Sequence, residues 1–137
     1  MEFNRLIPEL TVMDIERTKK FYIDFLGFKL EYERPEDKFI FVSLEGSQFM
    51  FEEFHDTGWN VNELDYPLGR GINFSIEVDD IGPIYEKFLA EGYPIFRTLM
   101  TSRYEVNGVF MEQKEFLVQD PDGYLLRFNE DKACNEI

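Results

Sequence analysis

The stretches Val12-Met13-Asp14-Ile15 and Val78-Asp79-Asp80-Ile81 carry the same pattern, Val-x-Asp-Ile, at two places in the chain. Each follows an apolar segment typical of a strand and precedes apolar residues at helical spacing. An aspartate at this point can cap a helix, because its carboxylate accepts hydrogen bonds from the free amides of the first turn. The repeat therefore predicts one small module present twice, with a ligand cavity between the copies.

Around the first motif, the pattern predicts a βαβββ module over residues 6–54. A strand at 6–12 precedes a helix that ends at Gly27, where glycine can adopt the left-handed conformation that stops a helix. Three strands follow, at 28–33, 38–44 and 48–54, separated by turn-prone segments. One face of the helix is apolar at three-to-four-residue spacing, so it packs against the sheet.

The second motif predicts the same plan over residues 72–129. Strands are expected at 72–78, 93–99, 113–119 and 124–129, with a helix between Asp80 and Gly92. Asp120-Pro121-Asp122-Gly123 predicts a tight turn, because proline suits its second position and glycine its last. Residues 100–112 are expected to form an irregular binding loop. A linker at 55–71 would join the modules, held down by Trp59 and Tyr66.

These patterns predict an α+β fold in which two βαβββ modules form curled mixed sheets around a cavity. At 137 residues, the chain is expected to form one domain, 1–137, made of both modules. Aromatic residues make up 17% of it, which is far above what a disordered chain carries. The single cysteine, Cys134, has no intramolecular disulfide partner, so a reducing compartment is compatible with the sequence.

The charge balance narrows the choice of partners. Fourteen Lys and Arg against 28 Asp and Glu give a net charge of −14, which repels nucleic acid phosphates and anionic lipid surfaces. We therefore expect neither nucleic acid nor a membrane as partner. The N-terminus lacks the layout of a signal peptide, and no apolar run is long enough to span a bilayer, so we expect a cytoplasmic protein. The acidic charge serves solubility or, as a sharper alternative, a cationic ligand.

Three features together resemble one family. They are the duplicated Val-x-Asp-Ile unit, Phe21-Tyr22 followed by Leu26-Gly27-Phe28, and the closing run from Glu115-Phe116 through the Asp-Pro-Asp-Gly turn to Arg127-Phe128. The chain resembles the vicinal oxygen chelate superfamily, which contains glyoxalase I, extradiol dioxygenases, fosfomycin-modifying enzymes and bleomycin resistance proteins. The resemblance covers about residues 6–129.

Enzymes of that superfamily hold a divalent metal with four side chains, one from the first and one from the last strand of each module. The resemblance places Ile7, Glu52, Asn73 and Arg127 at these positions. Isoleucine has no lone pair to offer, and the guanidinium of Arg127 would repel a cation. We therefore expect no metal and no other cofactor. Glu52 and Arg127 either form an ion pair across the cavity or contact a ligand.

Among the superfamily, the metal-free bleomycin resistance proteins are the nearest likeness, because Gln113-Lys114-Glu115-Phe116 resembles their Gly-Arg-Glu-Phe run. That likeness implies an arm-exchanged homodimer that sequesters a cationic, planar-ringed drug in grooves between subunits. Those proteins carry a tryptophan just before the run, where Glu112 stands here, so ring stacking would come from elsewhere. Phe39, Tyr104 and Phe110 are the candidates, with core packing as the alternative for each. Glu9 lies on the same strand face as Ile7 and would add a carboxylate to the ligand groove.

Three functions stay open from the sequence. The first is a non-enzymatic binding protein for a cationic or aromatic ligand, possessing no catalytic residue, with a bleomycin-type antibiotic as one candidate. It would use Glu9, Glu52, Asn73 and Arg127 for polar contacts. The second is a lyase, isomerase or dioxygenase with a relocated metal held by Glu9, Glu52 and Glu77. The third is an interaction protein that docks a basic partner. His55, the only histidine, is expected to be a solvated loop residue.

Overall fold

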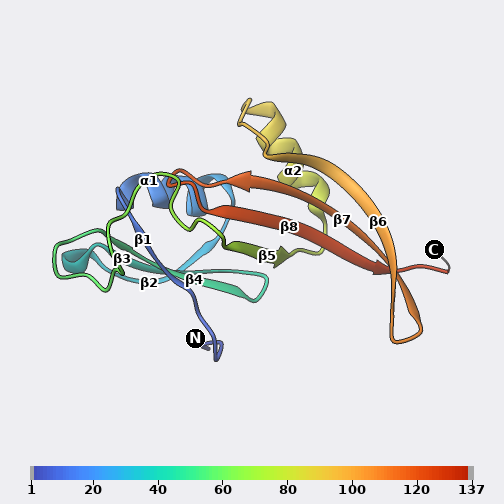
Figure 1. Ribbon diagram of the computed structural model, residues 1–137, viewed down its shortest axis with the longest axis horizontal. Helices are drawn as coiled ribbons and strands as arrows, with labels where there is room; N and C mark the ends of the chain where they lie inside the picture. Colours follow the sequence, from blue (N-terminus) through green and yellow to red (C-terminus); the bar gives the residue numbers. More distant parts are fainter. Residues whose placement is uncertain (1, 136–137) are drawn as a thin grey trace. The chain divides into compact units, whose positions relative to one another are not determined.

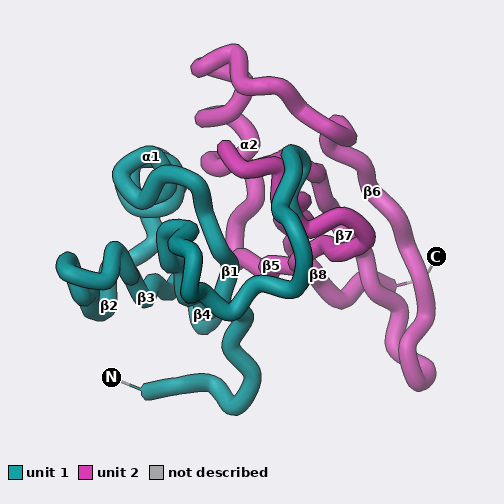
Figure 2. The backbone as a smooth tube through the Cα atoms, turned by 60° about the vertical axis from the view of Figure 1, so that its left-hand side comes forward, with its two compact units in different colours: residues 1–68 teal, residues 69–137 magenta. Residues whose placement is uncertain are grey.

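A computed structural model describes residues 2–135 and divides into two compact units, residues 1–68 and 69–137, called unit 1 and unit 2 below (Figure 2). Each unit contains one helix-bearing segment and one four-stranded sheet (Figure 1). The linker predicted at 55–71 lies in unit 1 as far as Leu68. That the two modules enclose a shared cavity stays a prediction.

Unit 1 contains the first βαβββ module. Its elements are β1 (Glu9–Val12), α1 (Ile15–Lys19), the π-helix η1 (Lys20–Phe25), β2 (Lys29–Arg34), the 3-10 helix η2 (Pro35–Asp37), β3 (Phe39–Leu44) and β4 (Ser47–Glu53). The strand order is β1-β4-β3-β2, with β1 parallel to β4 and the other pairs antiparallel. The helix predicted between Asp14 and Gly27 is therefore present, but its second half, Lys20–Phe25, is π-helical.

Unit 2 repeats this plan. Its elements are β5 (Asn73–Glu77), α2 (Ile81–Ala90), β6 (Arg97–Val106), β7 (Val109–Gln119) and β8 (Leu125–Ala133). The order β5-β8-β7-β6, with β5 parallel to β8, matches that of the first sheet. The predicted α+β fold of two βαβββ modules with mixed sheets is confirmed.

The repeated motif has the same structural role in both units. Asp14 accepts hydrogen bonds from the backbone N–H groups of Glu16 and Arg17, at 3.0 and 3.2 Å, and Asp80 accepts one from Gly82 at 3.2 Å. A glutamate from the last strand binds the first helical residue. Glu53 accepts from Ile15 N–H and Glu130 from Ile81 N–H, both at 3.0 Å. Each helix start is therefore held by a local cap and by a long-range carboxylate.

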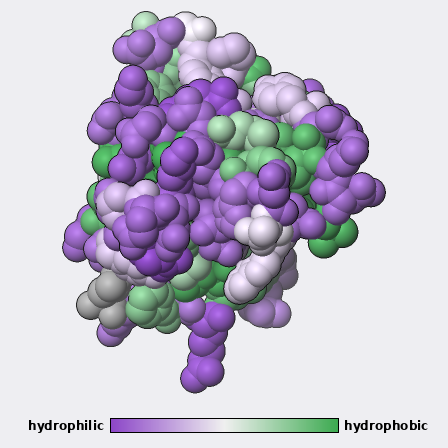
Figure 3. All heavy atoms as spheres, turned by 90° about the vertical axis from the view of Figure 1, so that its left-hand side faces the viewer, coloured by the Kyte–Doolittle hydropathy of each residue, from purple (hydrophilic) through white to green (hydrophobic). Residues whose placement is uncertain are grey.

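Aromatic side chains fill the space between helix and sheet in each unit. In unit 1, the buried Tyr22 ring lies 4.4 Å from that of Phe51, and α1 packs against β4. In unit 2, Phe88 of α2 lies 5.6 Å from Phe116, which stacks on Phe128 at 5.5 Å. The opposite face of the unit 1 sheet carries polar side chains such as Glu9 together with aromatic ones such as Phe41. Hydrophilic residues predominate on the molecular face drawn in Figure 3.

One prediction about the second module is wrong. Residues 100–112, expected as an irregular binding loop, form the long hairpin β6–β7. Its turn is Asn107-Gly108, where both residues have positive φ angles, 49° and 83°. This dipeptide is the strongest short-range signal for a two-residue hairpin turn. The strand expected at 93–99 accordingly begins only at Arg97.

Candidate functional site

Unit 1 contains a cleft of about 330 Å³ lined with acidic side chains, called the acidic cleft below. Side chains from β1, from the end of β2 and η2, from β4 and from the loop after β4 contribute to it. Three carboxylates face one guanidinium, so the cleft carries excess negative charge. It is lined by Glu9, Arg34, Asp37, Glu52, His55, Thr57, Gly58 and Trp59.

Strand register explains why these side chains meet. Glu52 pairs with Thr11 on the neighbouring parallel strand, and Glu9 lies two residues before Thr11, on the same face. On its other side, Glu52 pairs with Phe39. The buried residues Leu10 and Val12 point to the opposite face, toward the core. Alternation along β1 therefore places Glu9 on the same sheet face as Glu52.

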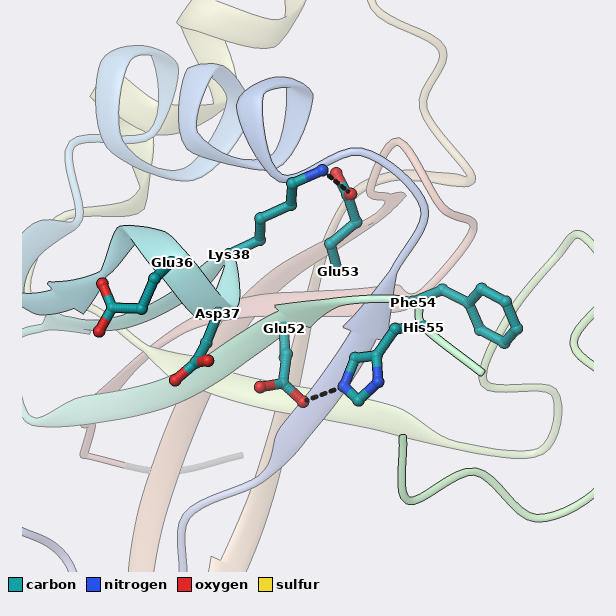
Figure 4. A pocket seen from close by; sticks show the side chains of 7 residues that line it. All are labelled: Glu36, Asp37, Lys38, Glu52, Glu53, Phe54 and His55. Carbon is teal, nitrogen blue, oxygen red and sulfur yellow. Dashed lines mark hydrogen bonds and ion pairs between the residues drawn. The ribbon is translucent and has the colours of Figure 1, made fainter. Parts of the chain in front are cut away.

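Glu52 is linked to the only histidine. His55 Nε2 lies 3.3 Å from Glu52 Oε2, and its Nδ1 lies 3.0 Å from Thr57 Oγ1. Figure 4 shows the imidazole and the carboxylate pointing toward one another. His55 is exposed and lies on the loop after β4, as predicted. It also contacts the Glu52 carboxylate, which lines the cleft. The three-residue spacing of Glu52 and His55 was the available signal.

The carboxyl group of Glu9 is electrostatically coupled to Glu52. Desolvation by the surrounding cleft raises the pKa of Glu9, the negative charge of Glu52 raises it further, and Arg34 lowers it. A cation bound between these carboxylates would satisfy both. Two neighbouring carboxylates make the electrostatic potential in this part of the cleft negative.

Arg34 and Phe39 form another wall. The guanidinium lies 3.9 Å from the centroid of the Phe39 ring and donates from Nε to Asp37 Oδ2 at 3.1 Å. Phe39, expected as an apolar ligand contact, is only 2% exposed and is covered by Arg34. A ligand would therefore contact Phe39 only after Arg34 moved.

A second cleft of about 300 Å³ adjoins the first and shares Asp37, Glu52 and His55 with it (Figure 4). Its other side contains an ion pair between Lys38 Nζ and Glu53 Oε2 at 2.9 Å. Lys38 adopts a left-handed conformation, φ 50°, after η2, which turns the chain into β3. The remaining lining residues are Glu36 and Phe54.

In unit 2, two of the predicted positions meet. Arg127 Nη1 donates to Asn73 Oδ1 at 3.3 Å, and its Nη2 lies 3.1 Å from Glu115 Oε2. The resemblance had placed Asn73 and Arg127 at corresponding first-strand and last-strand positions, and the structure brings them together. The guanidinium therefore occupies the side-chain oxygen atoms of Asn73 and Glu115, which would otherwise be available to a metal ion.

Tyr104 and Phe110 lie on the hairpin β6–β7 and are half-buried. Tyr104 pairs with Met111, and Phe110 pairs with Glu105. Because directly paired residues share a sheet face and neighbours alternate, Tyr104 and Phe110 point to opposite faces of the hairpin. They therefore do not form one stacking surface together.

The residues present do not fit the superfamily's four-ligand metal cage. Ile7 has no donor atom, and Arg127 presents a cation that is hydrogen-bonded to Asn73 and Glu115. Within residues 2–135, no group of three or more His, Cys, Asp or Glu side chains is arranged to hold a metal ion. No helix in that described part is long and apolar enough to cross a membrane.

Sequence reasoning identified only Glu9 and Glu52 among the residues of the acidic cleft, and it missed Arg34, Asp37, His55, Thr57, Gly58 and Trp59 as site residues. Asp37 reaches it from η2, a single turn that begins at Pro35. Trp59, expected to anchor the linker together with Tyr66, is 94% exposed, so the prediction is wrong for Trp59. A tryptophan in a loop reads as an anchor because of its apolar area, but only side-chain contacts decide whether the ring is covered.

Comparison with known proteins identifies the family. A model of the glyoxalase/bleomycin resistance protein/dioxygenase superfamily matches residues 5–128, so the chain belongs to this superfamily. The chain is 28% identical to a bleomycin resistance protein of Geobacillus stearothermophilus, covering 89% of this chain and 92% of that protein. It is 30% identical to a lactoylglutathione lyase of Haemophilus influenzae, over 90% of each chain.

A solved structure supports the fold. The glyoxalase/bleomycin resistance protein/dioxygenase of Alicyclobacillus acidocaldarius superimposes with a TM-score of 0.62 and is 25% identical. The alignment covers 93% of this chain and 90% of that one. The resemblance seen in the repeated motif and closing run is thereby confirmed, while the relatives include both a resistance protein and a lyase.

Proposed function

We propose that this protein binds a small cationic, aromatic molecule in the acidic cleft and sequesters it without using a metal. The observation that carries the proposal is the meeting of Glu9 and Glu52 with the exposed indole of Trp59 in one cleft. Carboxylates attract a cation, and an exposed indole offers a face on which a cation or a planar ring can stack.

The electrostatics of Glu9 support this choice of ligand. Its raised pKa reflects the cost of holding two carboxylates close together in a desolvated cleft. A positive group between Glu9 and Glu52 would offset the repulsion between the two carboxylates. Binding of a cation is therefore favoured at this position. Similarity to bleomycin resistance proteins supports a ligand of the same chemical kind. A bleomycin-type antibiotic is therefore the first compound to test.

The proposal includes contacts in unit 2 and an oligomeric form. Asn73 and Arg127 offer an amide and a guanidinium, and Tyr104 and Phe110 offer half-buried rings. We propose that these residues also contact the ligand, that both modules act as one domain, and that the binding form is a cytoplasmic homodimer.

Titration calorimetry of chelator-treated protein with bleomycin and with a simple aromatic cation tests the proposal. We expect saturable binding that weakens about 10- to 100-fold in Glu52→Gln, since a charge-assisted contact is worth roughly 1.5–3 kcal/mol. Glu86→Gln, an equally conservative change at an exposed position of α2, is the matched control and should bind normally. Absence of binding heat for every cation tested would remove the sequestration hypothesis.

Trp59 has its own control. Trp59→Ala should weaken binding of the aromatic cation by about 5-fold or more, because ring stacking is lost. Val61 is also 94% exposed and lies two residues away, outside the acidic cleft. Val61→Ala should therefore leave the affinity unchanged.

A second candidate is a metal-dependent lyase, isomerase or dioxygenase with a relocated site at Glu9 and Glu52; Glu77, the third expected ligand, belongs to no cluster of three acidic, Cys or His side chains suited to a metal within residues 2–135. Similarity to the lactoylglutathione lyase of Haemophilus influenzae favours it. Two close carboxylates also suit magnesium or manganese. Elemental analysis of protein purified without chelator separates the candidates. One divalent ion per chain, lost in Glu9→Gln and in Glu52→Gln, would favour the enzyme over sequestration.

A further inference from the structure

The N-terminal arm, residues 2–6, covers an aromatic surface on the sheet face that carries Glu9. The Phe3 ring stacks on Phe41, with centroids 5.0 Å apart and planes at 19°, and meets Tyr32 edge-on at 6.5 Å. Phe41 pairs with Met50, which in turn pairs with Glu9. Since directly paired residues share a face, Phe41 and Glu9 lie on one face, separated by β4.

Weak contacts hold the arm in place. Asn4 donates from its backbone to Gln48 Oε1 and from Nδ2 to the Gly46 carbonyl, both at 2.8 Å. Gln48 Nε2 donates to the Glu2 carbonyl, also at 2.8 Å. All three hydrogen bonds are exposed, so each contributes little net stability. The arm precedes β1 and contributes no strand to the sheet.

The burial of the rings is asymmetric. Phe3 is 53% exposed, whereas Phe41 beneath it is completely buried. Phe3 thus gains only part of the stabilisation that a buried ring can gain, while it shields an aromatic surface from water. An incoming ring that also carried favourable contacts elsewhere on this face could replace it.

We infer that Phe3 occupies a subsite for a planar aromatic ring, built from Phe41 and Tyr32, and that a bound ligand's ring displaces it. The inference rests on the proposed cation site at Glu9 and Glu52. Neighbouring strands are about 4.8 Å apart, so the strands of Glu9 and Phe41 are separated by roughly 10 Å. The ligand class is therefore an aromatic amine whose ring and cationic group are about 10 Å apart.

Two amines of equal charge and chain length test the subsite. 6-Phenylhexylamine carries a ring at roughly the required distance from its ammonium group, and hexylamine lacks the ring. In calorimetric titrations, Phe3→Ala should bind 6-phenylhexylamine about 2- to 10-fold more tightly than the wild-type protein does, because a competing ring is gone. Its affinity for hexylamine should not change. Leu6→Ala removes another exposed apolar side chain of the arm, 85% exposed, and should alter neither affinity.

The outcomes separate this inference from the proposed function. If Phe3→Ala leaves the affinity ratio of the two amines unchanged, the subsite is wrong even though amines bind. If neither amine binds the wild-type protein, the cation site fails, and uncharged indole is titrated into Phe3→Ala while the Tyr32 ring resonances are followed by NMR. A saturable shift then supports the ring subsite alone, and no shift overturns it.

A Phe3→Ala variant that only loses an oligomeric state, with unchanged affinities, would identify Phe3 as a contact between copies and would also overturn the ring subsite.

Discussion

His55 Nε2 lies 3.3 Å from Glu52 Oε2, so the only histidine of the chain is a partner of the central carboxylate of the acidic cleft. The opposite ring nitrogen is held by Thr57 at 3.0 Å. Glu52 therefore shares one of its two oxygen atoms with a side chain from the following loop. A cationic ligand would compete with the imidazole for that oxygen.

Replacing His55 with alanine should strengthen the binding of an aromatic cation. Glu52 Oε2 would lose its protein partner, and one hydrogen bond corresponds to about a 2- to 10-fold change in affinity. Calorimetry at constant pH measures the difference. Thr57→Ala removes the contact at Nδ1 and leaves Glu52 paired, so it should have a smaller effect. Equal effects of the two substitutions would show that loop order, and not competition for Glu52, controls binding.

The affinity for a permanently charged quaternary ammonium ion should decrease as the pH falls through the pKa of Glu9. That pKa is raised above its usual value of 4.5 by desolvation and by Glu52, and is lowered by Arg34. Glu9 therefore becomes protonated, and stops attracting a cation, at a higher pH than an ordinary glutamate. Glu52→Gln should move this midpoint to lower pH and Arg34→Gln to higher pH. Midpoints that do not move, or move in the opposite directions, would contradict the coupling.

Glu53 and Glu130, which occupy equivalent positions at the helix starts of the two units, should make the free energy of unfolding sensitive to acid. The pKa of Glu130 is lowered chiefly by the hydrogen bond from Ile81 N–H, and that of Glu53 by Lys38 and then by Ile15 N–H. Because both folded-state pKa values lie below 4.5, the stability that these groups contribute is complete above that pH. It is lost as the pH falls through the folded values. Denaturant unfolding between pH 7 and pH 3 measures the loss.

Alanine substitutions at Glu130 and Glu53 test how much these helix-start contacts contribute to stability. Glu130→Ala should destabilise the protein by roughly 1–3 kcal/mol, because it leaves the buried start of α2 without its long-range acceptor. The side chain of Glu130 is 7% exposed and that of Glu53 is 21% exposed, so Glu53→Ala should cost less. Glu86→Ala, on the exposed side of α2, should be nearly neutral. A Glu86 effect as large as that of Glu130 would point to helix charge as the cause.

Gly69→Ala should be more destabilising than Gly71→Ala. Both glycines have positive φ angles, 75° and 85°, so alanine is strained at either position by about 1–2 kcal/mol. A Cβ at Gly69 would also overlap Cδ1 of Tyr124 and lie 2.8 Å from its Cε1, whereas Gly71 has open space around it. Overlap with a buried ring adds roughly 1–3 kcal/mol. Thermal unfolding of both variants checks the order, and equal losses would show that Tyr124 moves aside without cost.

Local sequence predicted most of the fold because its signals act over short distances. Asp14 and Asp80 cap the helices that follow them, and Gly27 and Gly92 have positive φ angles after the helices end. Asp120 accepts hydrogen bonds from the N–H groups of Asp122 and Tyr124, both at 2.9 Å, as its turn sequence indicates. Asn107-Gly108 is an equally clear local signal for a hairpin turn, so the loop predicted there is wrong for a reason that the sequence itself contains.

The sequence by itself determined the duplicated module, the helix starts and the tight turns, since each depends on residues a few positions apart. Alternation along β1 also placed Glu9 on the face of the predicted site. Only the tertiary structure decided that Asp37, His55 and Trp59 join Glu52 in one cleft, and that Phe3 covers Phe41. The physical reason is that these contacts depend on strand register and side-chain packing between distant segments, which no local pattern encodes.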